Sequence, residues 1–261
     1  MTRNRFKDAL TAGETQIGLW QTLGSPITVE LCAAAGFDWL LLDAEHGPYS
    51  IPVLLAQLQA MNGSASHPVV RVPATDSTSI RQVLDVGAMT ILAPFVESAA
   101  QAGAIVAATR YAPEGVRGLA AGQIRASRWG RDAAYIDEAN SQIGVLVQIE
   151  SRAGVDAIAE IAAVNGVDGV FIGPADLAAS LGYRGQPEHP EVRAVIDRLI
   201  DVARGVGKAV GVLTLNEQLA AHYIERRCTF VAVGTDVTVL AKGVDALAAR
   251  FCGRAATVAG Y

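Results

Sequence analysis

Two carboxylates, Glu150 and Asp176, stand at the ends of apolar runs that are one strand–helix unit apart in the chain. The runs are Gly144–Glu150 and Val167–Asp176, and Ser151–Asn165, with helically spaced apolar residues, separates them. If the runs are neighbouring parallel strands, their carboxyl ends lie roughly 4.8 Å apart. Two carboxylates at that separation repel unless a proton or a cation lies between them. A hard divalent metal ion takes oxygen ligands and leaves positions open for substrate, so the pattern indicates a metal-dependent enzyme.

Gln148 precedes Glu150 by two residues, so the two side chains point to the same face of the strand. Inward polar groups in an otherwise apolar strand are costly unless they bind something. The pair therefore indicates a ligand. For Glu150 alone, the alternative is a buried salt bridge to an arginine.

Two further side chains at predicted strand ends suit acid–base chemistry. His46 lies in Asp43-Ala-Glu-His-Gly-Pro48, and its pKa near neutrality makes it the candidate general base. The alternative is a histidine that caps the following helix. Arg71 ends the apolar run Val-Val-Arg-Val-Pro73, where a permanent cation would stabilise an oxyanion beside the metal. Alternatively, Arg71 pairs with Glu150 or Glu45, and both roles are compatible.

The segment Gly173-Pro-Ala-Asp176 predicts the start of a helix, with proline at the first helical position. The backbone N–H groups of Ala175 and Asp176 are then free to receive an anion such as a substrate carboxylate. Lysine placement argues against covalent imine chemistry, because Lys7, Lys208 and Lys242 all fall away from the predicted mouth. The chain also lacks the GxSxG and GxxxxGK[ST] motifs.

Strand-like and helix-like runs alternate along nearly the whole chain, which favours a parallel sheet with helical crossovers. The predicted strands are short, apolar and bounded by Gly, Pro or polar residues: Gln16–Gln21, Trp39–Asp43, Pro68–Val72, Thr90–Phe95, Gly144–Glu150, Gly169–Gly173, Ala209–Leu213 and Thr229–Val233. Helices fit between them, for example at Ile27–Ala35, Ile51–Met61, Ser79–Val86 and Ala99–Thr109. The alternation predicts an α/β protein, a (β/α)8 TIM barrel, with residues 1–261 forming a single domain. A doubly wound open sheet is the alternative, but no GxGxxG follows the first strand.

The longest irregular stretch, Tyr111–Tyr135, is rich in glycine. We expect it either to lie over the carboxyl-end mouth, as a loop after the fourth strand, or to form a surface excursion or subunit contact. The small-residue-rich tail from Phe251 to Tyr261 suggests mobility.

Composition excludes several classes of protein. The chain has 261 residues, 51% of them hydrophobic, and a formal net charge of −5. Scarce lysine and mild acidity argue against a nucleic-acid partner. No run of apolar residues is long enough for a membrane span, and no signal peptide is evident. Three cysteines without CxxC spacing predict reduced thiols and a cytoplasmic protein.

Several motifs, taken together, resemble one family. Asp43-Ala-Glu-His-Gly-Pro, Arg71-Val-Pro, Gly115-Val-Arg-Gly118, Gln148-Ile-Glu150 and Gly173-Pro-Ala-Asp-Leu177 look like those of the 4-hydroxy-2-oxoheptanedioate aldolase family. These enzymes are class II, metal-dependent pyruvate aldolases, related to the 2-keto-3-deoxy sugar acid aldolases and more distantly to citrate lyase β subunits. The resemblance runs in matching order from about Phe6 to Arg250.

The resemblance implies a role for each matched residue. Glu150 and Asp176 would ligate a divalent metal ion, Mg²⁺ or Mn²⁺, with Co²⁺ also compatible with an oxygen-only site. The keto acid would be held by Gln148 and by the backbone at Gly173, Ala175 and Asp176. Leu213 is a candidate apolar wall of the pocket, with ordinary barrel packing as the alternative. His46 would be the base, Arg71 would stabilise the enolate oxygen, and Asp85 would raise the basicity of His46. The family also implies a homohexamer whose mouths are completed by neighbouring subunits.

The predicted reaction is a reversible aldol addition in which a 2-keto acid, pyruvate or hydroxypyruvate, is enolised and added to an aldehyde. One rival is a carbon–carbon lyase acting on a CoA thioester, like the citrate lyase relatives, and this would need a basic groove for the CoA phosphates. The other rival is a non-catalytic barrel that binds a keto acid. The sequence does not decide the donor, the aldehyde, the metal, the stereoselectivity or the pathway.

Overall fold

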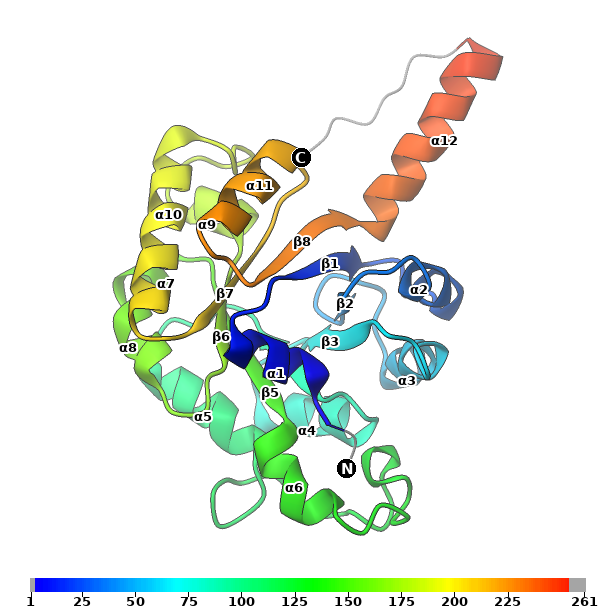
Figure 1. Cartoon of the computed structure of the whole chain (residues 1–261), viewed down its shortest axis with the longest axis vertical. Coiled ribbons are helices and arrows are strands. Elements are labelled where there is room, and N and C mark those ends of the chain that lie inside the picture. The colour runs from blue at the N-terminus through cyan, green and yellow to red at the C-terminus, as the bar shows by residue number, and fades with distance from the viewer. Residues whose placement is uncertain (1–2, 254–261) are drawn as a thin grey trace.

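Eight parallel strands close into one barrel in which each strand pairs with the next along the chain and β8 pairs with β1 (Figure 1). The computed structural model describes residues 3–253. The strands are β1 (Gln16–Gln21), β2 (Trp39–Asp43), β3 (His67–Arg71), β4 (Thr90–Ala93), β5 (Gly144–Ile149), β6 (Gly169–Ile172), β7 (Ala209–Leu213) and β8 (Phe230–Thr235). The predicted (β/α)8 barrel is confirmed, and the open-sheet alternative is wrong.

Helices return the chain between the strands. They are α1 (Arg5–Ala12), α2 (Pro26–Ala33), α3 (Ile51–Ala60), α4 (Ser77–Asp85), α5 (Ala99–Thr109), α6 (Tyr135–Gln142), α7 (Arg152–Asp156), α8 (Ile158–Ala163), α9 (Pro174–Ser180), α10 (Pro190–Gly205), α11 (Glu217–Glu225) and α12 (Asp236–Cys252), with a 3-10 turn η1 at Arg125–Ser127. Local sequence explains many of the helix starts. Ser25, Ser50 and Ser98, for example, each accept a hydrogen bond from a first-turn backbone N–H. Within residues 3–253, no helix is both long and apolar enough to cross a bilayer.

Side chains alternate between two cores because strand residues point to opposite faces of the sheet. In β5, Val145, Val147 and Ile149 pack outward against the helices, whereas Leu146 belongs to the cluster inside the barrel. Gln148 follows Leu146 by two residues. It therefore projects toward the barrel axis near the carboxyl end, as the spacing predicts.

Helix α1 closes the amino end of the barrel. Phe6 is buried, stacks on His67 with ring centroids 5.4 Å apart, and contacts Phe230 edge-on at 6.0 Å. The Asn4 side chain donates hydrogen bonds to the backbone oxygen of Met89 and to Thr90 Oγ1. Because α1 covers the amino end, the carboxyl end is the open mouth of the barrel.

Helix α12 follows β8 but projects away from the barrel (Figure 1). Its first residue, Asp236, is buried and accepts hydrogen bonds from Thr22 and from the N–H of Leu23, which ties the base of the helix to β1. Beyond that anchor, α12 exposes an apolar stripe made of Val237, Leu240, Val244, Leu247 and Phe251. The spacing of three and four residues places these side chains on one face of the helix.

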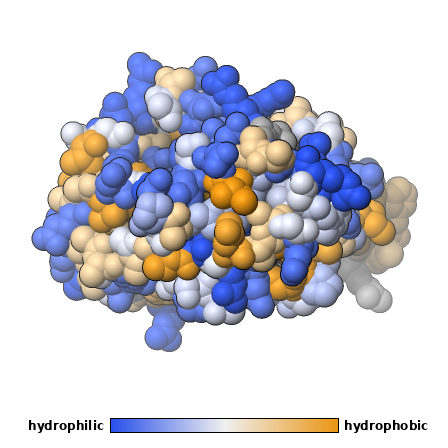
Figure 2. Space-filling view, turned by 90° about the horizontal axis from the view of Figure 1, so that it is seen from below, coloured by the Kyte–Doolittle hydropathy of each residue, from blue (hydrophilic) through white to orange (hydrophobic). Residues whose placement is uncertain are grey.

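The glycine-rich stretch Tyr111–Tyr135 does not cover the mouth of its own chain, so the first of its two predicted roles is wrong. A surface excursion or subunit contact stays a prediction. Helix α5 lies between β4 and the stretch and carries the chain back to the amino end of the barrel. Arg125 Nη1 there donates to the backbone oxygen of Val86, which precedes β4. Figure 2 views the molecule from the side of α6 and shows a surface of mixed hydrophilic and apolar residues. Most of the tail predicted to be mobile lies outside the described residues; its first residues, Phe251 and Cys252, end α12.

Candidate active site

Glu150 follows β5 and is almost fully buried in the barrel mouth, with 1% of its surface exposed. Gln148 Nε2 donates to Glu150 Oε2 at 2.6 Å, and the backbone N–H of Phe95 donates to Oε1 at 2.9 Å. Within residues 3–253 no arginine forms an ion pair with this carboxylate, so the predicted alternative of a buried salt bridge is wrong. Burial raises the pKa of Glu150 to about 7, and the nearby carboxylates of Asp176 and Glu45 contribute in the same direction.

Asp176 reaches the same space from the next strand. Ile149 in β5 is in register with Ile172 in β6, and α9 begins directly after β6 with Asp176 in its first turn. The influence of Asp176 on the pKa values of both Glu150 and Glu45 places the three carboxylates within electrostatic reach of one another. The structure therefore brings the two predicted metal ligands together at one end of the barrel.

Gly173 leaves the space that this arrangement needs. A Cβ atom at this position would lie 2.5 Å from Glu150 Oε2 and 2.7 Å from Gln148 Nε2, closer than real contacts allow. Gly173 has no side chain to cap α9, and no other described side chain caps it. The first-turn N–H groups, including those of Ala175 and Asp176, therefore have no intrahelical partner. Their predicted role, to receive the substrate carboxylate, stays a prediction.

Arg71 is held by two acids at the end of β3. Its Nε donates to Asp43 Oδ1 at 3.0 Å, its Nη2 donates to Asp43 Oδ2 at 2.6 Å, and its Nη1 lies 2.8 Å from Glu45 Oε2. Its guanidinium also lies 5.0 Å from the centre of the Trp20 ring. Burial opposes ionisation of Asp43, but the hydrogen bonds from Arg71 and Trp20 outweigh it and lower the pKa of Asp43. Of the predicted partners, Glu45 is therefore correct and Glu150 is wrong.

Of the two acids that hold Arg71, Asp43 and Glu45, Glu45 is the less readily ionised. Burial raises the pKa of Glu45, and the charges of Asp43 and Asp176 add to that effect against Arg71 and His46. A carboxyl group with a raised pKa next to a fixed guanidinium is a candidate for proton transfer.

His46 lies on the open side of the mouth. Its side chain is 65% exposed, its Nε2 lies 3.8 Å from Glu45 Oε2, and its backbone N–H donates to Asp43 Oδ1 at 3.2 Å. Ser50, not His46, caps the following helix α3, so the alternative role for His46 is wrong.

Leu213, at the end of β7, packs against the cluster that includes Phe171 and Trp20 and so forms part of the apolar floor of the mouth.

Asp85 is not near His46 within one chain. It is the last residue of α4, so it lies at the amino end of the barrel, where Arg117 Nη2 donates to its Oδ1 at 2.9 Å. Arg117 also donates to the Tyr135 hydroxyl. In the isolated chain, Asp85 therefore serves as the counter-ion of a buried arginine.

The mouth suits a hard cation with few protein ligands. Within residues 3–253 no group of three or more His, Cys, Asp or Glu side chains is arranged to hold a metal ion. Glu150 and Asp176 offer two carboxylates, and Gln148 Oε1 is buried without a hydrogen-bond partner. Mg²⁺ commonly takes one or two carboxylates and completes its shell with water and substrate oxygens. The donor set and the unpartnered oxygen both fit that chemistry.

The sequence analysis missed two contributors to this site. Trp20 donates its Nε1–H to Asp43 Oδ2 at 3.0 Å, and the Phe95 backbone donates to Glu150. The sequence carries a signal for Trp20, an indole one residue from the end of a predicted strand. In the structure its ring packs against Phe171. Phe95 could not have been found, because its N–H is aimed by a backbone with φ of 49°, where the predicted strand ends early at Ala93.

The chain matches the HpcH/HpaI aldolase/citrate lyase family over residues 16–243. The 4-hydroxy-2-oxo-heptane-1,7-dioate aldolase of Klebsiella pneumoniae is 54% identical over 254 residues, covering 97% of this chain and 96% of that protein. The protein of the same description from Salmonella dublin is 53% identical over 249 residues, covering 95% of each.

Among solved structures, an HpcH/HpaI aldolase/citrate lyase family protein from Burkholderia cenocepacia superposes with a TM-score of 0.91 at 38% identity, covering 96% of this chain and all of that one. The citrate lyase β subunit of M. tuberculosis, solved with oxaloacetate and magnesium, superposes with a TM-score of 0.57 at 21% identity and covers 86% of this chain and 93% of that one, so it supports the fold alone. The chain belongs to the HpcH/HpaI aldolase/citrate lyase family. The predicted family and the aldolase class of enzyme are confirmed.

Gly173→Ala tests whether the close packing of Gly173 against Glu150 and Gln148 matters. The added methyl group must displace the Glu150 carboxylate or the Gln148 amide, so we expect aldolase activity to fall by about 10²-fold or more while the fold is kept. The matched control is Gly103→Ala in α5, where a Cβ has open space and should be neutral or stabilise the helix by about 0.5–1 kcal/mol. Activity and circular dichroism of both variants decide. Full activity in Gly173→Ala would show that the crowded geometry has no part in the reaction.

Proposed function

We propose that this aldolase catalyses a reversible aldol reaction between a 2-keto acid, pyruvate or hydroxypyruvate, and an aldehyde, with Glu150 and Asp176 holding a divalent metal ion. The observation that carries the proposal is a buried carboxylate, Glu150, that forms no ion pair with a cationic side chain among residues 3–253 and lies within electrostatic reach of a second carboxylate. The curated relatives support this substrate class, since both are described as aldolases of a 4-hydroxy-2-oxo dicarboxylate.

The bound divalent ion, Mg²⁺, Mn²⁺ or Co²⁺, would act as a Lewis acid that makes the C3 protons of the keto acid more acidic. The free N–H groups of Ala175 and Asp176 and the Gln148 amide would bind the carboxylate and keto oxygens. His46 would take the C3 proton, and Arg71, fixed by Asp43 and Glu45, would stabilise the negative charge that develops on the C2 oxygen. C3 would then bond to the aldehyde carbon as the aldehyde C=O π bond breaks, and the aldehyde oxygen would take the proton back from His46 to become a hydroxyl group. Leu213 would contact the apolar part of the substrate.

The two rivals have less support. A CoA-thioester lyase needs a basic groove for phosphates at the mouth. The main arginine-rich cavity of the described residues lies at the opposite end of the barrel. A simple keto-acid binder would need neither an accessible imidazole nor an arginine clamped by two acids. A cytoplasmic location is also part of the proposal, supported by three cysteines that are all unpaired.

Metal removal tests the proposal directly. In protein treated with EDTA and desalted, exchange of the pyruvate C3 protons with deuterated solvent, followed by NMR, should be lost and should return with Mg²⁺ or Mn²⁺. Exchange reports proton abstraction without any aldehyde, so it also separates an enzyme from a binding protein. Undiminished exchange in metal-free protein would contradict the scheme.

His46 can be tested by the same exchange reaction. His46→Ala should lower the exchange rate by roughly 10²-fold or more, because the imidazole proposed to take the C3 proton is removed. The matched control is His189→Ala, which removes a histidine from the N-cap of α10 and should leave exchange unchanged. If His46→Ala retains the wild-type rate, the base must be reassigned, with Glu45 as the next candidate.

We propose in addition that the chain assembles as a homohexamer in which neighbouring subunits complete the mouths. Three observations support assembly. The apolar stripe of α12 is exposed, the His46 side chain is open to solvent, and Asp85 can act on a His46 only if that histidine belongs to another copy. Exposed apolar patches of this kind usually mark association surfaces.

Substitution in the stripe tests the assembly. Leu240→Ser with Leu247→Ser should lower the mass measured by light scattering after gel filtration, because two large apolar side chains leave the contact. Ala246→Ser with Ala249→Ser places the same hydroxyl groups beside the stripe and should leave the mass unchanged. A monomeric wild-type chain would contradict this part of the proposal.

A further inference from the structure

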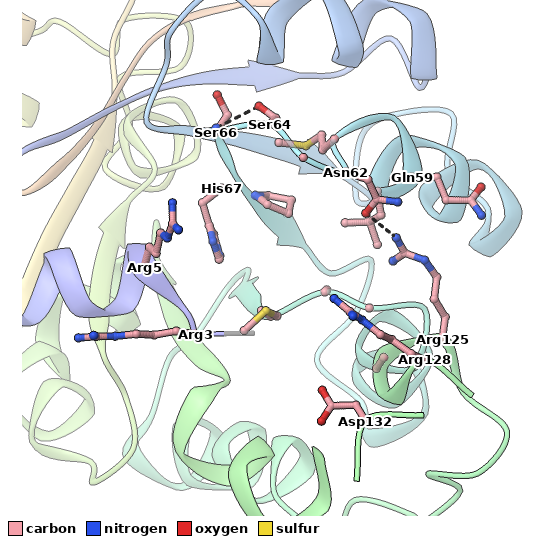
Figure 3. A pocket seen from close by; sticks show the side chains of 18 of the residues that line it. Arg3, Arg5, Gln59, Asn62, Ser64, Ser66, His67, Arg125, Arg128 and Asp132 are labelled. Atoms are coloured by element: carbon pink, nitrogen blue, oxygen red, sulfur yellow. Dashed lines mark hydrogen bonds between the residues drawn. The ribbon is translucent and has the colours of Figure 1, made fainter. Parts of the chain in front are cut away.

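An open cavity of about 1400 Å³ lies at the amino end of the barrel, on the far side from the aldolase site. It is bordered by the starts of β3 and β4, the end of α3, the N-terminal segment and the stretch around η1 (Figure 3). Five arginines of the described residues line it: Arg3, Arg5, Arg125, Arg128 and Arg131. Asp132 is the one carboxylate among the described lining residues. This local excess of positive charge is unusual in a chain whose net charge is −5.

The cavity arginines have little charge compensation. Among the described residues, Arg3 pairs with Asp8 at the surface, and Arg5, Arg125, Arg128 and Arg131 form no ion pair. Arg125 is half-buried and donates only to neutral oxygens, those of Val86 at 2.7 Å and Asn62 at 3.2 Å. Burial accordingly lowers the pKa of Arg125. A desolvated guanidinium without a counter-ion is costly unless an anion binds to it.

The backbone that carries these arginines is strained. Arg128 and Trp129 have φ of 54° and 55° and are followed by Gly130 at 79°, so two side-chain-bearing residues adopt the left-handed conformation. Such residues are uncommon, and for a bulky one such as tryptophan the conformation is a real outlier. The turn is held by Ser127, whose Oγ accepts from the Gly130 N–H at 3.1 Å and donates to the Ile124 oxygen. Strain of this kind concentrates at ligand sites.

We propose that this cavity binds a small molecule carrying two or more phosphate groups. Arginine is suited to phosphate because its planar fork donates two parallel hydrogen bonds. The arginines occupy separate walls, with Arg3 and Arg5 beside α1 and Arg125 and Arg128 on the opposite side (Figure 3). A ligand with two phosphate groups could engage arginines of both walls at once.

Calorimetric titration of the full-length, magnesium-loaded protein tests the proposal. Fructose 1,6-bisphosphate serves as the two-phosphate probe and fructose 6-phosphate as the one-phosphate probe, at constant ionic strength. We expect saturable binding of the bisphosphate and at least 10-fold weaker binding of the monophosphate. Arg128→Gln with Arg131→Gln should weaken bisphosphate binding by about 30-fold or more, because two charge-assisted contacts are lost.

Two controls keep the result specific. Arg193→Gln with Arg198→Gln on α10 changes the net charge equally and should leave binding unchanged. Arg5→Gln removes a cation from the other wall and should also weaken the bisphosphate more than the monophosphate. Equal losses in the cavity and α10 variants would indicate non-specific charge attraction. Absence of saturable binding to the wild type, or unchanged affinity in Arg128→Gln/Arg131→Gln, would overturn the proposal, including the case in which another copy of the chain covers the cavity.

Discussion

The site depends on the burial of Glu150, which forms no ion pair with a cationic side chain in the described part of the chain. A carboxylate that is 1% exposed normally survives in a protein interior by pairing with arginine or lysine. Here Arg71, at the end of β3, pairs with Asp43 and Glu45 instead. The burial raises the pKa of Glu150 to about 7, so the carboxylate needs a proton or an external cation in neutral solution. Among the described residues, the other side chains of the mouth do not supply that cation to Glu150.

The arrangement around Glu150 keeps the positive charge of Arg71 from pairing with the carboxylate of Glu150. Asp43 takes two of the guanidinium donors of Arg71 and Trp20 orients Asp43, so the arginine is held away from Glu150. Gly173 then gives the carboxylate and the Gln148 amide room that any side chain would remove. Arg71 on one side, and the metal ion that Glu150 and Asp176 are proposed to hold on the other, would both stabilise the negative charge that develops on the substrate. Preorganised electrostatics of this kind require no rearrangement during the reaction.

Much of the barrel and of its mouth followed from periodicity. Alternation in β5 placed Gln148 and Glu150 on the interior face, and the order of strands placed Asp176 next to them. Features that depend on the third dimension did not follow. The sequence offered Glu45 and Glu150 as partners of Arg71 and could not decide between them. The structure pairs Arg71 with Glu45 and with Asp43. The amide of Phe95 reaches Glu150 through one left-handed residue, which the sequence does not mark.

The stretch at residues 110–134 shows why direction matters as much as composition. Its glycines suggested a loop over the mouth, but α5 first returns the chain to the amino end of the barrel, where the stretch contacts Asp85 and Val86. The two ends of one chain therefore carry different chemistry: acids and Arg71 at the carboxyl end, and Asp85, Arg117 and the arginine cavity at the amino end. In a closed assembly, the amino end of one subunit can meet the mouth of another. Such a contact would bring Asp85 toward a His46 that a single chain leaves exposed. It would form the Asp85–His46 pair that the family resemblance implies.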